Sequence, residues 1–197
     1  MFDLWKYVVQ AGSIGYVLVG VSIIATGVIL ERYLFWARQS KDFTKGFDPK
    51  IAAAFKAKDK TTLLKQAAEI KGLEGDALKM VANNLHCKED APLDIAMNQV
   101  VESSTQFLWI LELCSGIAPM FGILGTVAGI IVSFQGMSGD MPDTGVMVAG
   151  ISVSMTTTAI GLIVALIALI PANHLATMAH KRQIKIASLL QEYWINK

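Results

Sequence analysis

The sequence predicts an all-α integral membrane protein with three transmembrane helices and long cytoplasmic helical extensions. Apolar residues make up 53% of the 197 residues and charged residues only 17%, against about 25% in typical soluble domains. The mean hydropathy of +0.49 agrees with this class. Three apolar runs each reach the roughly 20 residues that cross a bilayer, and a long polar stretch separates the first run from the other two.

The charge pattern divides the chain into seven segments. Basic residues follow the first and third apolar runs, whereas the loop between the second and third runs carries Asp140 and Asp143 and no Lys or Arg. The positive-inside rule then places the N-terminus in the periplasm and the C-terminus in the cytoplasm. The predicted segments are an interfacial segment 1–13, a first span 14–36, a cytoplasmic helical region 37–107, a second span 108–134, a periplasmic loop 135–144, a third span 145–174 and a cytoplasmic helix 175–197.

The N-terminal apolar run is expected to be retained, because it lacks the basic cluster of a cleaved signal peptide and is too long for one. Within the cytoplasmic region we expect helices from Pro49, over 59–70 and over 76–85. A further helix is expected to start after Asp90 and to continue without a break into the second span. This region is too small and too weakly apolar to form a separate core, so its helices are expected to pack on each other as extensions of the spans.

The sequence offers no sign of an enzyme, a cofactor site or a nucleic-acid interface. It contains no glycine-rich phosphate loop, no paired catalytic carboxylates and no metal-ligand cluster. The adjacent His86 and Cys87 have no partner pair, and Cys87 and Cys114 do not form a disulfide framework. We therefore predict a protein that is not an enzyme and that has no cofactor beyond a translocated ion.

Small and hydroxyl side chains follow one face of the second and third spans. The spacing is four, three and four residues in the second span and four, four, three and four in the third, which keeps the side chains on one side of a helix. This pattern is typical of close helix packing, and it also fits hydroxyl ligands for a proton donor, a water chain or a small cation. The candidate pore-lining residues are Thr126, Thr158, Ser154 and Ser133, and the candidate packing or kink residues are Pro119, Gly122, Gly125, Gly129, Gly150, Gly161 and Pro171.

The apolar parts of these two spans contain no carboxylate, and the nearest acid is Glu112 at the cytoplasmic end of the second span. No charged residue lies between Leu113 and Gly139 or between Thr144 and Pro171. Ion-translocating membrane proteins usually keep an ionisable residue at membrane depth. If this chain conducts ions, the titrating group must therefore come from another chain.

Two motifs resemble those of the MotA/TolQ/ExbB proton-channel family. Residues 118–127 (APMFGILGTV) resemble the A-P-x-x-G-L-L-G-T-V signature of the second span. Residues 150–165 (GISVSMTTTAIGLIVA) resemble the third-span signature, with Thr158 at its threonine. The order of the spans and the size of the cytoplasmic region look like the three-span ExbB/TolQ branch.

The resemblance implies a subunit of an ion-driven motor in the bacterial inner membrane. It implies a homopentameric ring around two copies of a single-span ExbD/TolR-like partner, whose membrane aspartate is the titrating group. An envelope protein of the TonB/TolA type is a further implied partner. Thr126 and Thr158 fall on the two threonines that face the pore in the family, so they are expected to meet that aspartate or the ion it carries.

One position departs from the family pattern. ExbB and TolQ commonly have a glutamate five residues before the third-span threonine, and this chain has Val153 there. The neighbouring hydroxyls would also admit Na⁺, but protons are favoured because few fixed oxygen ligands are present. The alternative function is a non-conducting membrane scaffold that anchors an envelope complex, and it predicts that Thr126 and Thr158 tolerate replacement.

Overall fold

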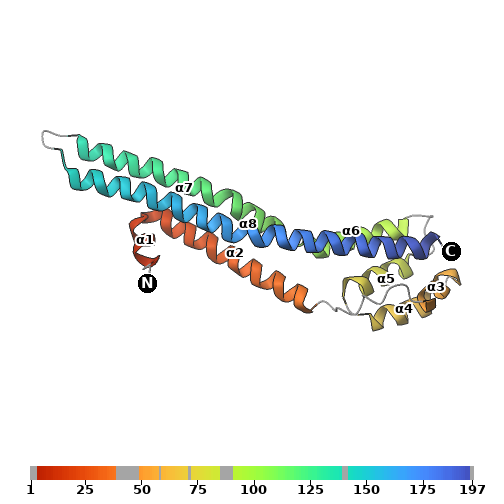
Figure 1. Ribbon diagram of the computed structural model, residues 1–197. Coiled ribbons are helices and arrows are strands. Elements are labelled where there is room, and N and C mark those ends of the chain that lie inside the picture. Colours follow the sequence, from red (N-terminus) through yellow and green to blue (C-terminus); the bar gives the residue numbers. More distant parts are fainter. Residues whose placement is uncertain are drawn as a thin grey trace. The chain divides into compact units, whose positions relative to one another are not determined.

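The computed structural model describes residues 4–38, 49–57, 59–70, 72–84, 91–138 and 142–195. All regular structure in these ranges is α-helical (Figure 1), which confirms the predicted all-α class for this part of the chain. The adjacent residues His86 and Cys87, and residues 139–141 of the loop between the second and third spans, lie outside the described ranges. The helices are α1 (Leu4–Gln10), α2 (Gly12–Arg38), α3 (Pro49–Lys56), α4 (Lys60–Glu69), α5 (Leu73–Asn83), α6 (Ala91–Thr105), α7 (Leu108–Met137) and α8 (Thr144–Ile195).

Three of these helices are long and apolar enough to cross a membrane. They are α2, α7 and the part of α8 over Thr144–Glu192. Because every backbone N–H and C=O group must be satisfied within the bilayer, uninterrupted helices of this length are the structure expected there. The three predicted spans therefore each fall on a membrane-length helix.

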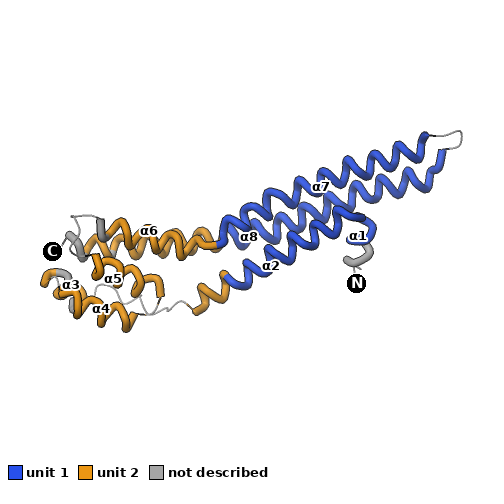
Figure 2. The backbone as a smooth tube through the Cα atoms, turned by 180° about the vertical axis from the view of Figure 1, so that it is seen from behind, with its two compact units in different colours: residues 1–31, 107–173 blue, residues 32–106, 174–197 orange. Residues whose placement is uncertain are grey.

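The chain forms two compact units (Figure 2). Unit 1 comprises Met1–Glu31 and Phe107–Asn173, and unit 2 comprises Arg32–Gln106 and His174–Lys197. Both α2 and α8 contribute residues to each unit. Unit 1 holds the apolar parts of the three long helices, and unit 2 holds α3 to α6 together with the last part of α8.

The core of unit 1 is built from small and medium apolar side chains. Leu18 of α2 packs with Ala118 of α7 and with Val164 and Ala165 of α8, surrounded by Ile14, Val21, Phe121 and Ile160. Three alanine or valine positions in this cluster allow the helix backbones to approach one another. Most large apolar side chains of α7 and α8 point outward instead, as expected for helices that face lipid or another subunit.

The expectation that the region after the first span forms no separate core is wrong, because unit 2 has its own apolar core, which the end of α8 completes. Joined by Ile51 and Ala54 of α3, buried side chains of α4, α5, α6 and α8 form most of it: Leu63, Ala67, Leu73, Ala77, Leu78, Val81, Ala82, Ala96, Val100, Ile186 and Leu190. Asp59 caps the N-terminus of α4 by accepting bonds from the hydroxyls of Thr61 and Thr62 at 2.6 and 2.5 Å. These hydroxyl bonds, with those from the two backbone N–H groups, lower the pKa of Asp59 from 3.8 to about 2.

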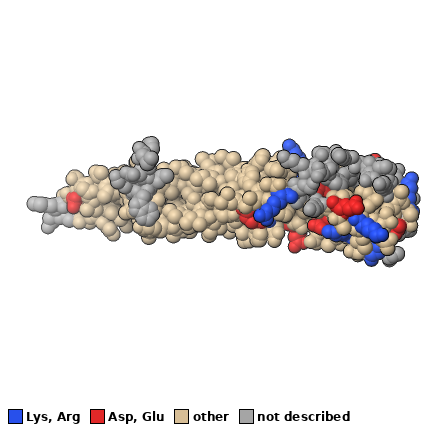
Figure 3. All heavy atoms as spheres, turned by 90° about the horizontal axis from the view of Figure 1, so that it is seen from below, with Lys and Arg blue, Asp and Glu red and all other residues tan. Residues whose placement is uncertain are grey.

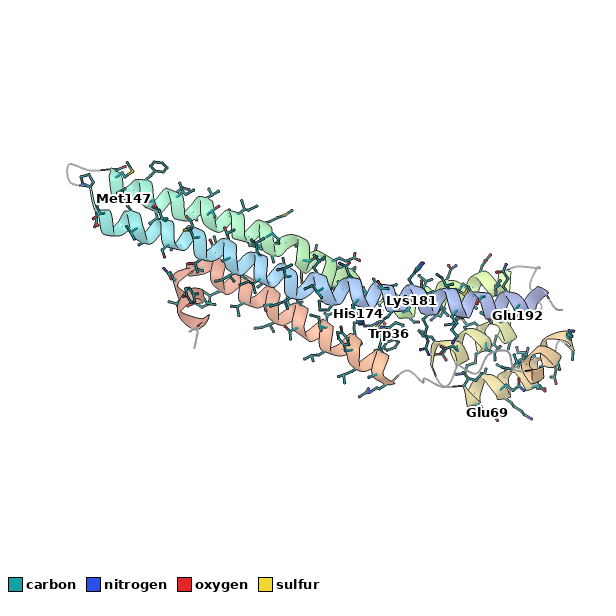
Figure 4. The ribbon with its side chains drawn as sticks, in the orientation of Figure 1. Trp36, Glu69, Met147, His174, Lys181 and Glu192 are labelled. Atoms are coloured by element: carbon teal, nitrogen blue, oxygen red, sulfur yellow. The ribbon has the colours of Figure 1, made fainter. Side chains whose placement is uncertain are left out.

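Polar side chains also link the helices inside unit 2. Arg182 of α8 donates from Nε to Oε1 of Glu74 of α5 at 2.5 Å, and Glu74 is buried. On α8, Gln183 donates to the hydroxyl of Ser104 of α6 at 2.6 Å. His174, labelled in Figure 4, stacks on Tyr33 of α2 with ring centroids 6.3 Å apart. Because buried polar groups are costly unless they are paired, the contacts of buried Glu74 and Ser104 fix which faces of α5, α6 and α8 meet.

The predicted continuous helix from Asp90 into the second span is wrong. The chain instead ends α6 at Thr105 and begins α7 at Leu108, with Phe107 in the left-handed conformation at φ 63°. No glycine or proline marks this break. The hydroxyls of Ser104 and Thr105 both donate to the carbonyl of Val101, at 3.0 and 2.7 Å, and such local bonds compete with regular helix geometry.

Candidate functional site

The closest helix contact in unit 1 lies between α7 and α8, which run side by side (Figures 1 and 2). The buried face of α7 carries glycines at positions 122, 125, 129 and 136. The facing surface of α8 carries Gly150, Ser154, Thr157 and Gly161, all buried. Small residues at helical spacing let two backbones approach closely, so the predicted stripes do meet in the structure.

The glycines are required sterically at this contact. A Cβ atom at Gly129 would lie 2.5 Å from the carbonyl oxygen of Gly150, and a Cβ at Gly150 would lie 2.5 Å from the carbonyl oxygen of Gly129. A Cβ at Gly161 would lie 2.8 Å from the carbonyl oxygen of Ala118. Since these obstacles are backbone atoms, a side chain cannot rotate away to make room.

Three hydroxyls bridge the two helices. Ser133 of α7 donates to the carbonyl of Met147 on α8 at 3.0 Å, near the labelled Met147 in Figure 4. Ser154 of α8 donates to the carbonyl of Thr126 at 3.0 Å, and Thr158 donates to the carbonyl of Gly122 at 3.2 Å. Three of the four candidate pore-lining hydroxyls therefore also hold α7 against α8.

Thr126 and Thr158 lie on this contact, but their hydroxyls have different acceptors. Thr126 donates to the carbonyl of Ile123 on its own helix at 2.6 Å, whereas Thr158 donates across to α7. Both side chains are half-buried. A hydroxyl that has used its single proton still has two lone pairs. Each of these two threonines can thus accept a hydrogen bond from a further donor.

Both candidate kink prolines lie inside helices that continue past them. Pro119 is within α7 and Pro171 is within α8. A proline removes one helical hydrogen bond, here the one to the carbonyl four residues earlier. Pro119 adjoins Ala118, whose carbonyl faces Gly161 across the helix pair.

Two residues that sequence spacing did not single out also make contacts between helices of unit 1. Thr157 is fully buried against Gly125. Gln10 of α1 donates through its side-chain amide to the hydroxyl of Ser152 of α8. The signal for Thr157 was its place among the hydroxyls of residues 152–158, but nothing near Gln10 in the sequence indicates a partner 142 residues away.

The stretches of α7 and α8 that form this contact carry no charged side chain, from Leu113 to Met137 and from Thr144 to Pro171. Figure 3 shows charged side chains gathered over unit 2 and a largely uncharged surface over the apolar helices. Among the described residues, no group of three or more His, Cys, Asp or Glu could hold a metal ion. What this site can offer chemically is hydroxyl and carbonyl oxygen, without a titrating group of its own.

Comparison with known proteins identifies the family of this chain. The model of the MotA/TolQ/ExbB proton channel family matches residues 64–187, which is more than half of the chain. The chain belongs to this family. It is a membrane protein of the ExbB/TolQ type, as the two sequence motifs predicted, and both motifs fall within the matched range.

Individual relatives carry names from the same family. The chain is 31% identical over 102 residues to the Tol-Pal system protein TolQ of Haemophilus influenzae, covering 51% of this chain and 45% of that protein. It is 29% identical over 164 residues to a biopolymer transport protein ExbB homolog of Methanothermobacter thermautotrophicus, covering 80% and 57%. With the biopolymer transport protein ExbB of Helicobacter pylori it shares 45% identity over 73 residues, covering 36% and 50%. The chain thus spans about half the length of these relatives.

Proposed function

We propose that this chain is a subunit of a proton-driven motor in the bacterial inner membrane, which converts the ion-motive force into work on a cell-envelope partner. One observation carries the proposal. In a member of a proton channel family, α7 and α8 present half-buried Thr126 and Thr158 on a close helix pair that contains no Asp, Glu, Lys, Arg or His between Thr144 and Pro171 or between Leu113 and Met137.

The missing titrating group is supplied by a partner in this proposal. A single-span protein of the ExbD/TolR type would place one aspartate at membrane depth, where an ionisable residue is expensive and is normally functional. When protonated, the aspartate would donate to a lone pair of Thr126 or Thr158. When ionised, it would be released from that position, so that ion passage moves the partner relative to the ring.

The assembly proposed is a homopentamer of this chain around two copies of the partner. The outward apolar side chains of α7 and α8, such as Met155 at 72% exposure and Met120 at 68%, leave ample surface for neighbouring subunits and lipid. The basic residues after the first and third spans support a periplasmic N-terminus and a cytoplasmic C-terminus. A TonB/TolA-type protein would receive the work.

Protons are the proposed ion. The hydroxyls around Val153 that would favour Na⁺ have structural acceptors or donors: Ser154 bonds to Thr126, Thr157 bonds to Val153 and Ser154, and Ser152 accepts from Gln10. Na⁺ needs several oxygen ligands at one point, whereas a proton needs only one acceptor. Because Ser154 and Thr157 are also buried, their oxygen atoms are not accessible as Na⁺ ligands, and the arrangement supports proton transfer.

A non-conducting scaffold remains the second candidate, because a specific observation favours it. The hydroxyls of Ser133, Ser154 and Thr158 bridge α7 and α8. A helix pair built only for packing would use these residues in the same way. The motor needs the remaining lone pairs of Thr126 and Thr158 as hydrogen-bond acceptors, whereas the scaffold does not.

Replacing Thr158 with valine is expected to reduce proton flux strongly while the complex still assembles. Valine keeps the shape of threonine but removes the acceptor oxygen, and a lost positioned group typically costs about 10²- to 10⁴-fold in proton-transfer rate. The measurement is proton flux in proteoliposomes that contain the chain and its single-span partner, with Thr126→Val beside it. Thr158→Ser, which keeps the hydroxyl, is the matched control and should conduct. If both valine variants conduct like the original chain, the two threonines are packing residues and do not lie on the ion pathway, whereas an original complex that conducts no protons would favour the scaffold.

A further inference from the structure

Thr157 is the most deeply buried polar residue of the contact between α7 and α8. Its exposed fraction is 0%, and its hydroxyl donates to the carbonyls of Val153 and Ser154 on its own helix, at 2.9 and 3.0 Å. Because the hydroxyl is enclosed and engaged with backbone, it is not available to an ion or to a partner side chain.

The side chain of Thr157 lies directly against Gly125 of α7. A Cβ atom at Gly125 would collide with Oγ1, Cβ and Cγ2 of Thr157, the last at 2.8 Å. This differs from the Gly129–Gly150 contact, where the carbonyl oxygen of each glycine lies where a Cβ atom of the other would be placed. At Gly125, therefore, a side chain rather than a backbone determines how closely the two helices approach.

The contact is flanked by the two threonines of the proposed pathway. Gly125 precedes Thr126, and Thr157 precedes Thr158, which reaches across to Gly122. A Cβ at Gly122 would in turn lie 3.2 Å from Cα of Thr158. Any change in helix spacing at the Gly125–Thr157 contact must therefore shift both threonines.

We propose that Thr157 is a positioning residue: by filling the space above Gly125 it sets the separation of α7 and α8 and so holds Thr126 and Thr158 in place. The inference rests on the proposed function, since it assigns Thr157 a part in the same ion pathway. It predicts that the volume of Thr157 matters and that its hydroxyl does not. For Thr158 the prediction is reversed: its hydroxyl matters and its volume does not.

The first test compares valine at two adjacent positions, in the chain assembled with its single-span partner in proteoliposomes. Thr157→Val keeps the volume and should leave proton flux per assembled complex unchanged, whereas Thr158→Val should reduce it. Equal losses in the two variants would overturn the inference, because they would show that the Thr157 hydroxyl acts on the ion.

The second test moves the glycine from α7 to α8. Gly125→Ala should lower flux per assembled complex by about tenfold or more, since misplacement of reacting groups by about 1 Å has effects of this size. Adding Thr157→Gly to Gly125→Ala restores the space and should recover most of the flux. Gly116→Ala is the matched control, because a Cβ there meets nothing within 4 Å. A double variant no better than Gly125→Ala would overturn the inference.

A structural readout separates this inference from the proposed function. Solid-state NMR of the labelled complex should show a cross peak between Gly122 and Thr158 that weakens in Gly125→Ala and returns in the double variant. If the original complex conducts no protons but the cross peak follows this order, the positioning role stands and the proposed function fails. If the cross peak is the same in all variants, the positioning role fails.

Discussion

Replacing Glu74 with alanine is expected to destabilise unit 2 strongly. The Glu74 side chain is only 2% exposed, and it accepts the Arg182 Nε–H at 2.5 Å. Removing one partner of a buried ion pair costs about 3–5 kcal/mol because the remaining charge is left unpaired. Arg182 is 24% exposed, so the lower end of that range is expected.

The measurement is the midpoint of thermal unfolding of the purified protein in detergent, followed by circular dichroism. For a chain of 150–250 residues, about 3 kcal/mol corresponds to a fall of roughly 6–12 °C. Asp76→Ala is the matched control from the same first turn of α5, because its partner Lys79 forms an exposed pair at 3.1 Å, and exposed pairs contribute about 0–1 kcal/mol. The double variant Glu74→Met with Arg182→Met should recover much of the loss. Equal shifts for Glu74→Ala and Asp76→Ala would contradict the assigned burial of the pair.

Alanine at Gly129 or Gly150 is expected to prevent normal pairing of α7 with α8. In each case the new Cβ would lie 2.5 Å from the carbonyl oxygen of the opposite glycine. Overpacking typically costs about 1–3 kcal/mol and more where the neighbour cannot move, and here the neighbour is helix backbone. Unlike the Gly125 substitution, this clash cannot be relieved by trimming a side chain.

The yield of monodisperse protein after size-exclusion chromatography in mild detergent checks this prediction. Gly129→Ala and Gly150→Ala should each reduce the yield sharply. Gly20→Ala and Gly27→Ala, in α2, are matched controls because a Cβ at either position meets nothing within 4 Å. Normal yield and unfolding midpoint for Gly129→Ala would show that the close contact between the two helices does not exist in the protein.

Local sequence patterns were sufficient to predict the three membrane-length helices and the faces on which α7 and α8 pair. The uncharged runs required helical spans, and the glycine spacing of the second and third spans indicated the face on which α7 meets α8. Gly122 and Gly129 are buried at that contact, as expected for packing residues. These features depend on residues within a few helical turns of each other, which a single sequence displays directly.

The register of the contact could not be predicted in the same way. On α8, both Thr157 and Thr158 are neighbours of Ser154, at three and four residues, and helical spacing alone does not rank them. The structure buries Thr157 completely and leaves Thr158 half-buried. Only the position of α7 decides between the two, and that position is a tertiary property.

Pairs distant in the chain were also beyond prediction. Glu74 and Arg182 are 108 residues apart, and Gln10 and Ser152 are 142 residues apart. Glu74, Arg182 and Gln10 lie in neither motif, and Ser152 lies in the third-span motif, but the local sequence of none of them gives a sign of its distant partner. The break between α6 and α7 at Phe107 could not be predicted either, because only the hydroxyls of Ser104 and Thr105 mark it in the sequence.

The measurement that most directly tests the proposed motor function is proton flux with and without the partner. Proteoliposomes would contain this chain alone, this chain with a single-span protein that has one aspartate in its span, or this chain with the same protein carrying Asp→Asn. Since the apolar parts of α7 and α8 contain no carboxylate and no histidine, flux should appear only with the unaltered partner. Proton flux through the chain alone, or undiminished flux with the Asp→Asn partner, would contradict the proposal that a partner supplies the titrating group.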